Sequence, residues 1–234
     1  MAKLSNSLAL TLYLKIDFTM AQKEKNVSYT STNSYSTLNE LGENTKNIWI
    51  VFHGIGYLSR YFIKYFNELP AEENYIIAPQ APSKYYLNNQ YRHVGASWLT
   101  KEETARETEN VLAYIESIMD YEKLPEDRNL IVFGFSQGVS IAARWAAQKK
   151  IKCQQLVLYA GGIPNELRPS DFEFLEKQRT KVTLLVGNQD EYIDANRLKS
   201  EQLKAKELFG DSFEQIIFAG KHELKKELIN NLIP

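Results

Sequence analysis

The sequence predicts an α/β protein with a mostly parallel central sheet and helices on both of its faces. Strands alternate with helices along almost the whole chain, and several strands are continuous apolar runs without the two-residue alternation of a half-exposed strand. Such runs are typical of strands buried on both faces, as crossover helices bury them in a parallel sheet. The length of 234 residues and the hydrophobic content of 44% fit one domain with its own core.

The strands are predicted from short apolar runs that end at turn residues. The clearest is NIWIVF at residues 47–52, which ends at His53-Gly54, and NLIVF at 129–133 is a second buried run. The polar residues 26–30 are a candidate first edge strand. The remaining strands are predicted over residues 75–78, 155–159, 181–186 and 213–218.

The helices are predicted from apolar residues at helical spacing between these runs. The strongest amphipathic pattern covers residues 101–121, and its acidic start at Glu102 and Glu103 suits the positive end of the helix dipole. Only about 20 residues separate the strands at 155–159 and 181–186, too few for an inserted cap domain. The Tyr- and Asn-rich residues 81–99 are predicted to be a long irregular loop. Further helices are predicted over residues 57–69, 137–148, 195–208 and 223–232.

The N-terminal residues 1–24 are predicted to be an extension, disordered or due to an upstream start with Met20 as the natural one, and residues 25–234 the single domain. The apolar run LALTLYL at residues 8–14 is far shorter than the roughly 20 residues that span a bilayer, so no transmembrane segment is expected. A cytoplasmic protein is expected. Export is the alternative, because a passable cleavage site at residues 19–21 follows the run.

The composition excludes several classes of function. Lys plus Arg number 28 and Asp plus Glu number 29, so no basic excess is available to neutralise phosphates, and nucleic acid is not an expected partner. The single cysteine, Cys153, excludes an intrachain disulfide and is expected in the core. Any catalytic imidazole must come from His53, His93 or His222. No metal and no cofactor are expected.

The candidate nucleophile is Ser136, in the segment Gly134-Phe-Ser136-Gln-Gly138. This G-x-S-x-G motif directly follows the strand NLIVF and directly precedes a predicted helix, which is the context that gives the motif its meaning. The sharp turn lifts the hydroxyl above the sheet at a helix N-terminus, and the glycines leave room for it. The alternative is a glycine-lined turn in which Ser136 only caps the helix.

The candidate base is His222, because a serine hydroxyl needs a base to remove its proton. His222 follows the strand at 213–218 after a short turn, so it lies at a strand's carboxyl end, as Ser136 does. His53 belongs to a glycine turn, and His93 lies in the Tyr-rich loop with no strand before it. The alternative is that His222 is an ordinary surface histidine.

The candidate acid is Asp190, which would fix the tautomer of the imidazole and stabilise its charged form. It lies in the loop after the strand at 181–186, between Ser136 and His222 in the chain. Glu191 is its neighbour and rival, because enzymes of this kind accept either acid. A loop acid that only makes an Asx turn is the other alternative.

The turn His53-Gly54-Ile55-Gly56 after the first buried strand is the candidate for half of an oxyanion hole. Two backbone N–H groups usually hold the oxyanion of an acyl transfer, one of them from the residue after the nucleophile, here Gln137. The second candidate donor is Ile55, with Gly56 its near rival.

The candidate substrate contacts are Gly56 and three aromatic side chains, Tyr57, Tyr86 and Trp98. Amphipathic aromatic rings are suited to line an acyl or leaving-group site. Alternatively the rings of the 81–99 loop pack it onto the sheet, and for Trp98 this is the favoured interpretation.

Four segments, VFHGIG, GFSQG, GNQDEYI and AGKH, together resemble the phospholipase/carboxylesterase family of α/β hydrolases, which includes acyl-protein thioesterases and small bacterial carboxylesterases. The chain order Ser, acid, His is that of α/β hydrolases. The resemblance starts near residue 47 and implies an α/β-hydrolase fold, with Ser136, Asp190 and His222 as a catalytic triad. In the family an Asp usually follows HGxG, where this chain has Tyr57, so the substrate is less defined than the chemistry.

These residues predict a serine esterase that cleaves a small ester or acyl substrate through an acyl-enzyme. A thioesterase or lysophospholipase would use the same triad and remains open. A non-catalytic scaffold that binds a ligand or protein is the alternative from another class. Monomer and homodimer are both open.

Overall fold

The computed structural model describes residues 23–233, and residues 33 onward form one compact unit. Residues 23–32 contain no helix or strand. The predicted N-terminal extension lies almost entirely outside the described residues and stays a prediction. No helix among residues 23–233 is long and apolar enough to cross a membrane.

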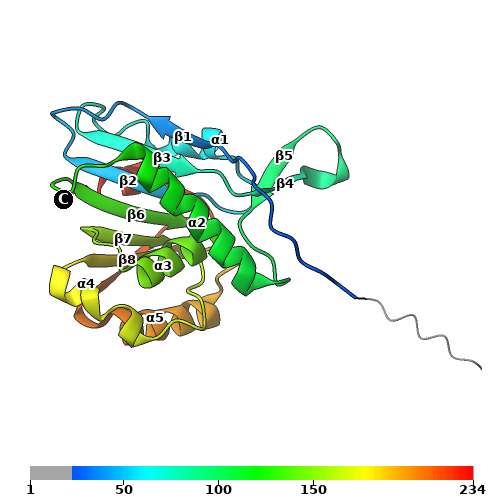
Figure 1. The fold of residues 1–234 in the computed structure, drawn as a ribbon. Helices are drawn as coiled ribbons and strands as arrows, with labels where there is room; N and C mark the ends of the chain where they lie inside the picture. Colours follow the sequence, from blue (N-terminus) through cyan, green and yellow to red (C-terminus); the bar gives the residue numbers. More distant parts are fainter. Residues whose placement is uncertain (1–22, 234) are drawn as a thin grey trace, which may run out of the picture. The chain divides into compact units, whose positions relative to one another are not determined.

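The compact unit is built on a twisted sheet with the strand order β1-β3-β2-β6-β7-β8-β9, seven strands within the described residues (Figure 1). All neighbouring pairs are parallel except β1, which pairs antiparallel with β3 at the edge. The strands are β1 (Tyr35–Leu38), β2 (Asn47–Phe52), β3 (Asn74–Pro79), β6 (Asn129–Phe135), β7 (Gln155–Tyr159), β8 (Lys181–Gly187) and β9 (Phe213–Phe218). The predicted α/β class with a mostly parallel sheet is confirmed.

Helices cover both faces of the sheet because every parallel connection has to cross back over it. One face carries α2 (Thr104–Glu122), α3 (Gln137–Lys149), α4 (Glu173–Gln178) and α5 (Ala195–Phe209). The other carries α1 (Ser59–Phe62), the 3-10 turn Ile63–Phe66 and α6 (Lys226–Asn230). Between β7 and β8 lie only a 3-10 turn and the short α4, so no cap domain is inserted there.

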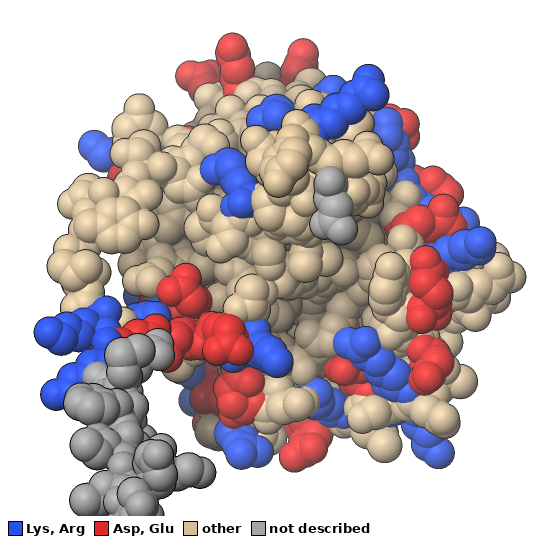
Figure 2. Space-filling view, turned by 90° about the vertical axis from the view of Figure 1, so that its right-hand side faces the viewer, with Lys and Arg blue, Asp and Glu red and all other residues tan. Residues whose placement is uncertain are grey.

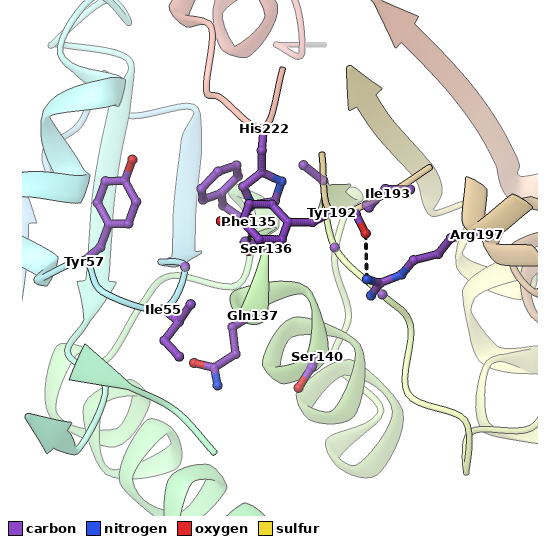
Figure 3. Close-up of a pocket in the computed structure, with 14 residues that line it drawn as sticks. Ile55, Tyr57, Phe135, Ser136, Gln137, Ser140, Tyr192, Ile193, Arg197 and His222 are labelled. Atoms are coloured by element: carbon purple, nitrogen blue, oxygen red, sulfur yellow. Dashed lines mark hydrogen bonds between the residues drawn. The ribbon is translucent and has the colours of Figure 1, made fainter. Parts of the chain in front are cut away.

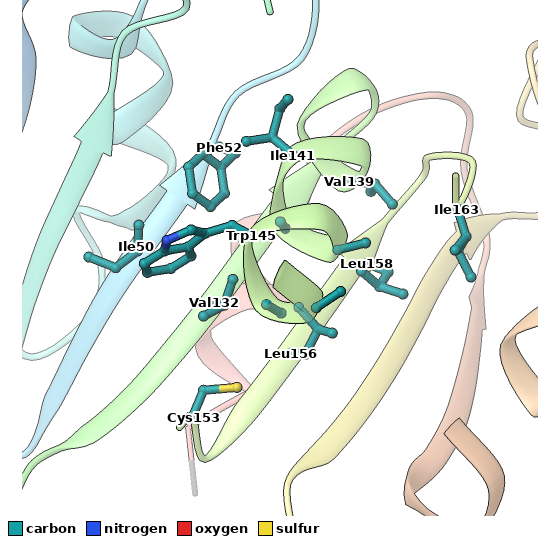
Figure 4. Close-up of a cluster of buried hydrophobic side chains, with 14 of the residues drawn as sticks. Ile50, Phe52, Val132, Val139, Ile141, Trp145, Cys153, Leu156, Leu158 and Ile163 are labelled. Carbon is teal, nitrogen blue, oxygen red and sulfur yellow. The ribbon is translucent and has the colours of Figure 1, made fainter. Parts of the chain in front are cut away.

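The core has two parts because the side chains of each buried strand alternate between the faces. In β2, Ile50 and Phe52 belong to the cluster under α2 and α3, whereas Trp49 and Val51 pack against the other face. Trp145 of α3 is fully buried and meets the ring of Phe52 edge-on at 5.9 Å, at the centre of the first cluster (Figure 4). Cys153 is buried in the same cluster, as expected.

The first strand was predicted in the wrong place. Residues 26–30 form no strand, and β1 lies further along at Tyr35–Leu38. Its sequence YSTL has weak apolar character, and its position depends on antiparallel pairing with β3 and on the hydrogen bond of the Tyr35 hydroxyl to Glu122. These are tertiary interactions that a local pattern does not contain.

The 81–99 segment is also more regular than predicted. It forms an antiparallel hairpin of β4 (Ser83–Tyr86) and β5 (Val94–Ser97) that projects beyond the main sheet (Figure 1). The predicted helix over 57–69 is shorter, since only α1 and the following 3-10 turn form, and α6 is shorter than 223–232. Helix α2 begins at Thr104, after Glu103 in a left-handed conformation, so the acidic pair precedes its first turn.

Candidate active site

Ser136 lies on a strained turn between the carboxyl end of β6 and the first residue of α3. Its backbone has φ 53° and ψ −117°, a region that residues with a side chain rarely enter and that costs about 1–3 kcal/mol. The N–H of Ser136 donates to the carbonyl of Tyr159 on the neighbouring strand at 2.8 Å. This bond helps hold the turn.

Two glycines of the motif are required by close backbone contacts. A Cβ on Gly138 would lie 2.1 Å from the carbonyl oxygen of Phe52, and one on Gly134 would lie 2.5 Å from the carbonyl oxygen of Gly138. The strand, the turn and the start of the helix therefore touch through bare backbone. Any side chain at either glycine would force them apart.

His222 lies in the loop after β9, next to the serine. Its Nε2 is 2.9 Å from the Oγ of Ser136, and its Nδ1 is 2.8 Å from Oδ2 of Asp190. The imidazole lies between the rings of Phe135 at 5.2 Å and Tyr192 at 4.8 Å. The ring is thus fixed by hydrogen bonds at both nitrogens and by contacts with Phe135 and Tyr192, whose rings lie beside it in Figure 3.

Asp190 is held as a hydrogen-bond acceptor. Its side chain is 0% exposed, and its Oδ1 accepts the backbone N–H groups of Tyr192 at 2.8 Å and Ile193 at 3.1 Å. Both oxygens of Asp190 therefore accept hydrogen bonds, one from two backbone amides and the other from the imidazole. The geometry makes Nδ1 of His222 the protonated nitrogen and leaves Nε2 to accept the proton of the serine.

Glu191, the rival acid, does not reach the imidazole ring. Its Oε2 accepts the backbone N–H of His222 at 3.3 Å instead. The loops after β8 and β9 are joined further by Gln189, whose N–H donates to the carbonyl of Gly220 at 2.8 Å. These cross-links set the distance between the acid and the histidine.

Ile55 and Gln137, the candidate oxyanion donors, both line the pocket beside Ser136. Gln137 is the first residue of α3, so its N–H has no acceptor within the helix. The N–H of Gly56 donates to the carbonyl of Ala96 at 2.8 Å, and this bond removes Gly56 as an oxyanion donor. Within residues 23–233 no acceptor binds the N–H of Ile55.

The side chain of Gln137 fastens the β4–β5 hairpin to the serine turn. Its Oε1 accepts the N–H of Trp98 at 2.8 Å, and its Nε2 donates to the carbonyl of Leu99 at 2.7 Å and to Oγ of Ser97 at 3.0 Å. The same strand, β5, holds Gly56 through Ala96. The hairpin therefore supports both halves of the candidate oxyanion hole.

His53 is a buried structural histidine. Its Nε2 accepts the N–H of Ala81 at 3.1 Å, so its Nδ1 carries the proton and donates to the carbonyl of Gly54 at 2.8 Å. Burial lowers the pKa of His53 from 6.5 to about 4, against a smaller opposing effect of the Gly54 carbonyl. The imidazole is therefore neutral at pH 7. His93 is exposed on the hairpin, away from the pocket lining.

The pocket around Ser136 measures about 430 Å³. Among the candidate substrate contacts, Tyr57 lies in its lining. Trp98 does not, because it is only 1% exposed and donates its Nε1–H to the carbonyl of His53 at 2.8 Å. Tyr86 is 52% exposed on the hairpin and lies outside the lining, as does Gly56. Gly56 and Tyr86 thus lie outside the pocket lining, and the burial of Trp98 agrees with the interpretation favoured for it, a ring that packs the loop onto the sheet.

The residues around the serine provide no cluster for a metal. Among the residues that the structure describes, no group of three or more His, Cys, Asp or Glu side chains has the arrangement to hold an ion. The chemistry that this geometry can perform is that of a hydroxyl, an imidazole, a carboxylate and backbone amides.

The sequence matches the phospholipase/carboxylesterase family over residues 33–233. The chain belongs to the phospholipase/carboxylesterase family. The predicted resemblance is thereby confirmed, and it begins earlier in the chain than residue 47. No protein with a curated function matches the sequence closely enough to count as a relative.

Solved structures of this kind share the fold of the chain. Acyl-protein thioesterase 2 of Zea mays has a TM-score of 0.64 at 16% identity, with 86% of this chain and 96% of the other covered. A phospholipase/carboxylesterase of Dyadobacter fermentans has a TM-score of 0.62 at 20% identity, covering 88% and 99%. The Bacillus cereus carboxylesterase has a TM-score of 0.59 at 14% identity, covering 86% and 92%. At these identities the likeness concerns the fold.

Several pocket residues of this phospholipase/carboxylesterase family member were missed by sequence reasoning. Phe135, Tyr192, Ile193 and Arg197 line the cavity, together with Ser140 one turn into α3. The signal that could have found Tyr192 and Ile193 is their position directly after β8, where the acid was sought. Arg197 gives no such signal, because it belongs to a helix whose pattern is ordinary.

Proposed function

We propose that this phospholipase/carboxylesterase family member is a serine hydrolase that cleaves carboxylic esters through an acyl-enzyme intermediate. The observation that carries the proposal is the continuous hydrogen-bonded series from Oγ of Ser136 through the imidazole of His222 to the carboxylate of Asp190. The strained turn that presents the serine is a second support.

In the acylation step, Nε2 of His222 removes the proton of Ser136 as Oγ attacks the ester carbonyl. The imidazolium that forms is stabilised by the carboxylate of Asp190, which itself stays ionised. Backbone N–H groups of Gln137 and Ile55 are proposed to hold the negative charge on the carbonyl oxygen. The proton then passes from Nε2 to the leaving alcohol, and the carbonyl is restored on the acyl-enzyme.

In the deacylation step, water replaces the alcohol. Nε2 of His222 takes a proton from the water as its oxygen attacks the acyl carbon, and the same proton returns to Oγ of Ser136 when the acid leaves. No redox change and no further reactant are involved.

The proposed substrate is a small ester. A volume of about 430 Å³ lies at the small end of the range of ligand pockets. A thioester or a lysophospholipid ester would be cleaved by the same steps and remains the alternative within this chemistry.

A p-nitrophenyl butyrate assay tests the proposal, with Ser136→Ala as the inactive variant and Ser117→Ala as its matched control. The Ser117 side chain is on α2 and bonds the carbonyl of Ala113, far from this chemistry. We expect Ser136→Ala to lower kcat by a factor of about 10⁴ or more and Ser117→Ala to leave it unchanged. Equal rates for wild type and Ser136→Ala would refute the proposal.

A fluorophosphonate probe separates the enzyme from a non-catalytic scaffold. The folded wild-type protein is expected to be labelled at Ser136, as located by peptide mass spectrometry. Absence of labelling in folded protein would favour the scaffold that only binds a ligand or protein.

A further inference from the structure

The pocket contains one permanent charge, that of Arg197. Among the described residues that line it, no carboxylate, no lysine and no second arginine is found. The Arg197 side chain reaches from α5 toward the pocket (Figure 3). Uncharged side chains cover most of the centre of the molecular face at this end of the sheet (Figure 2). The positive charge of Arg197 among uncharged side chains therefore distinguishes this pocket.

The guanidinium of Arg197 is held in place from two sides. Its Nη1 donates to the carbonyl of Tyr192 at 2.8 Å, the dashed line in Figure 3. Its Nη2 lies against Gly162, where an added Cβ would be only 2.9 Å away. The adjacent Gly161 in turn packs against Ser136, since its Cβ would lie 2.2 Å from the serine carbonyl oxygen. The charge is therefore close to the serine turn, with only Gly161 and Gly162 between them.

The carboxylates around Arg197 are engaged by other groups. Asp194 accepts the backbone N–H of Arg197 at 2.8 Å as the N-cap of α5, and Asp190 holds His222. Oε2 of Glu201 accepts the N–H of Ile163 at 2.9 Å and lies 3.8 Å from Nζ of Lys204, whereas its Oε1 borders Gly162 beside Nη2 of Arg197 without coming within ion-pair distance of it. Within residues 23–233 no carboxylate forms an ion pair with Arg197. Its remaining donors are available to a ligand.

We propose that Arg197 recognises an anionic group, a carboxylate or a phosphate, on the ester that this site cleaves. This inference rests on the proposed function. Arginine presents a planar set of donors that matches these groups, and its charge is retained at every relevant pH. The preferred substrates are thus esters with a negative charge a short distance from the scissile carbonyl, and Arg197 is a specificity-determining residue.

The charge of the substrate can lie in the acyl part or in the leaving group, and two series of esters distinguish the sources. Mono-p-nitrophenyl esters of dicarboxylic acids, from succinate to suberate, place a carboxylate on the acyl chain. Butyrate esters of 4-hydroxybenzoate and of 4-hydroxyphenyl phosphate place the anion on the leaving group. p-Nitrophenyl butyrate is the neutral reference for both.

The test compares kcat/KM of wild type, Arg197→Met and Arg197→Lys on these esters. We expect Arg197→Met to lower kcat/KM about five- to fiftyfold more for at least one anionic series than for the neutral ester, whose own change reports the loss of the bond to Tyr192. Arg197→Lys should retain part of the preference, because it keeps the charge without the planar fork. The preference should also shrink as salt is added, since the side chain is exposed.

An equal fall for neutral and anionic esters would overturn the inference, because it would assign Arg197 the structural role of holding the Tyr192 loop. Unchanged kinetics on every ester would overturn it as well. Failure of the proposed function has a different signature, in which the wild type does not hydrolyse the neutral ester and the Ser136→Ala variant matches it.

Discussion

Asp190 and Glu191 are neighbours in the chain, but only Asp190 reaches the imidazole of His222. Asp190 bonds the imidazole of His222 at 2.8 Å, whereas Glu191 bonds only its backbone N–H at 3.3 Å. We expect Asp190→Asn to lower kcat by about 10³–10⁴, because the amide favours the wrong imidazole tautomer. Glu191→Gln, the matched control, should change kcat less than tenfold. Steady-state kinetics on p-nitrophenyl butyrate measure both. A larger fall in kcat for Glu191→Gln than for Asp190→Asn would assign the acid role to Glu191.

His53 makes the stability of the fold depend on pH. Because burial lowers its pKa from 6.5 to about 4, the unfolded chain binds a proton more readily than the folded one. The stability contributed by the neutral ring is fully present above pH 6.5 and is lost as the pH falls toward 4. We expect this residue to reduce the free energy of unfolding by about 3 kcal/mol between pH 7 and pH 4.

Urea denaturation across that range, in wild type and His53→Gln, isolates this contribution. The free energy of unfolding of the variant is expected to fall less steeply with acid than that of the wild type, whatever its value at pH 7. The carboxylates titrate in both proteins, so the difference in slope is due to His53. Parallel curves would show that His53 is not the responsible group.

Replacement of Gly138 by even the smallest side chain should strongly reduce the stability of the fold. In Gly138→Ala the new Cβ would meet the carbonyl oxygen of Phe52 at 2.1 Å, and backbone on both sides leaves little room to shift. We expect a loss of at least about 3 kcal/mol in the free energy of unfolding. Gly42→Ala is the control, because no atom lies within 4 Å of its added Cβ. Equal denaturation midpoints for the two variants would contradict the expectation.

At the scale of elements, the β4–β5 hairpin connects to the serine turn through one side chain. Gln137→Leu would remove the partners of the Trp98 N–H and the Leu99 carbonyl at once. We expect a loss of about 2 kcal/mol in stability and a fall in kcat of about tenfold, with KM changed less, because the oxyanion donors lose support. Ser97→Ala removes a single partner of Gln137 and should have a smaller effect in both measurements. An unchanged kcat in Gln137→Leu would show that the hairpin does not support the oxyanion donors.

The elements that could be predicted from sequence are those with a strong local pattern. β2 and β6 are buried on both faces, and this burial is written in their apolar runs. β4 is exposed along its whole length, and β1 is only partly buried. Neither therefore contains the continuous apolar run that identifies a buried strand. Their positions follow from pairing with β5 and β3. The Tyr-rich composition of residues 81–99 marked this segment as distinct from the rest of the chain, but it did not show that the segment forms a hairpin.

The candidate site could be predicted to a similar extent and for a related reason. Ser136, Asp190 and His222 each follow a parallel strand, so chain order and topology were enough to select them. Arg197 enters the pocket from the side, through the packing of α5 beside Gly162. For Trp98 the sequence left two interpretations open, because an aromatic ring in a loop near the site can either line the site or fill the core beneath it.

At the scale of the whole molecule, the part of the chain that the structure describes, residues 23–233, contains no inserted domain that would extend the pocket. A volume of about 430 Å³ accommodates a short acyl chain, and longer chains would leave most of their methylenes in water. We expect kcat/KM for p-nitrophenyl esters to be highest at short chains and to fall at least tenfold between butyrate and palmitate. The measurement is made below the critical micelle concentration of each ester. A rise toward palmitate would indicate an acyl groove elsewhere on the molecule.

The strand order has a consequence for how the protein acquires activity. The hydrogen bond between Ser136 and His222 joins residues 86 positions apart, and it forms only when β9 docks on β8 at the edge of the sheet. Ser136 follows β6 and His222 follows β9, so the two side chains meet only when β6, β7, β8 and β9 have paired in that order. A refolding chain should therefore cleave no ester before this half of the sheet is complete. Recovered hydrolysis thus reports the assembly of these four strands, which changes in tryptophan fluorescence do not by themselves show.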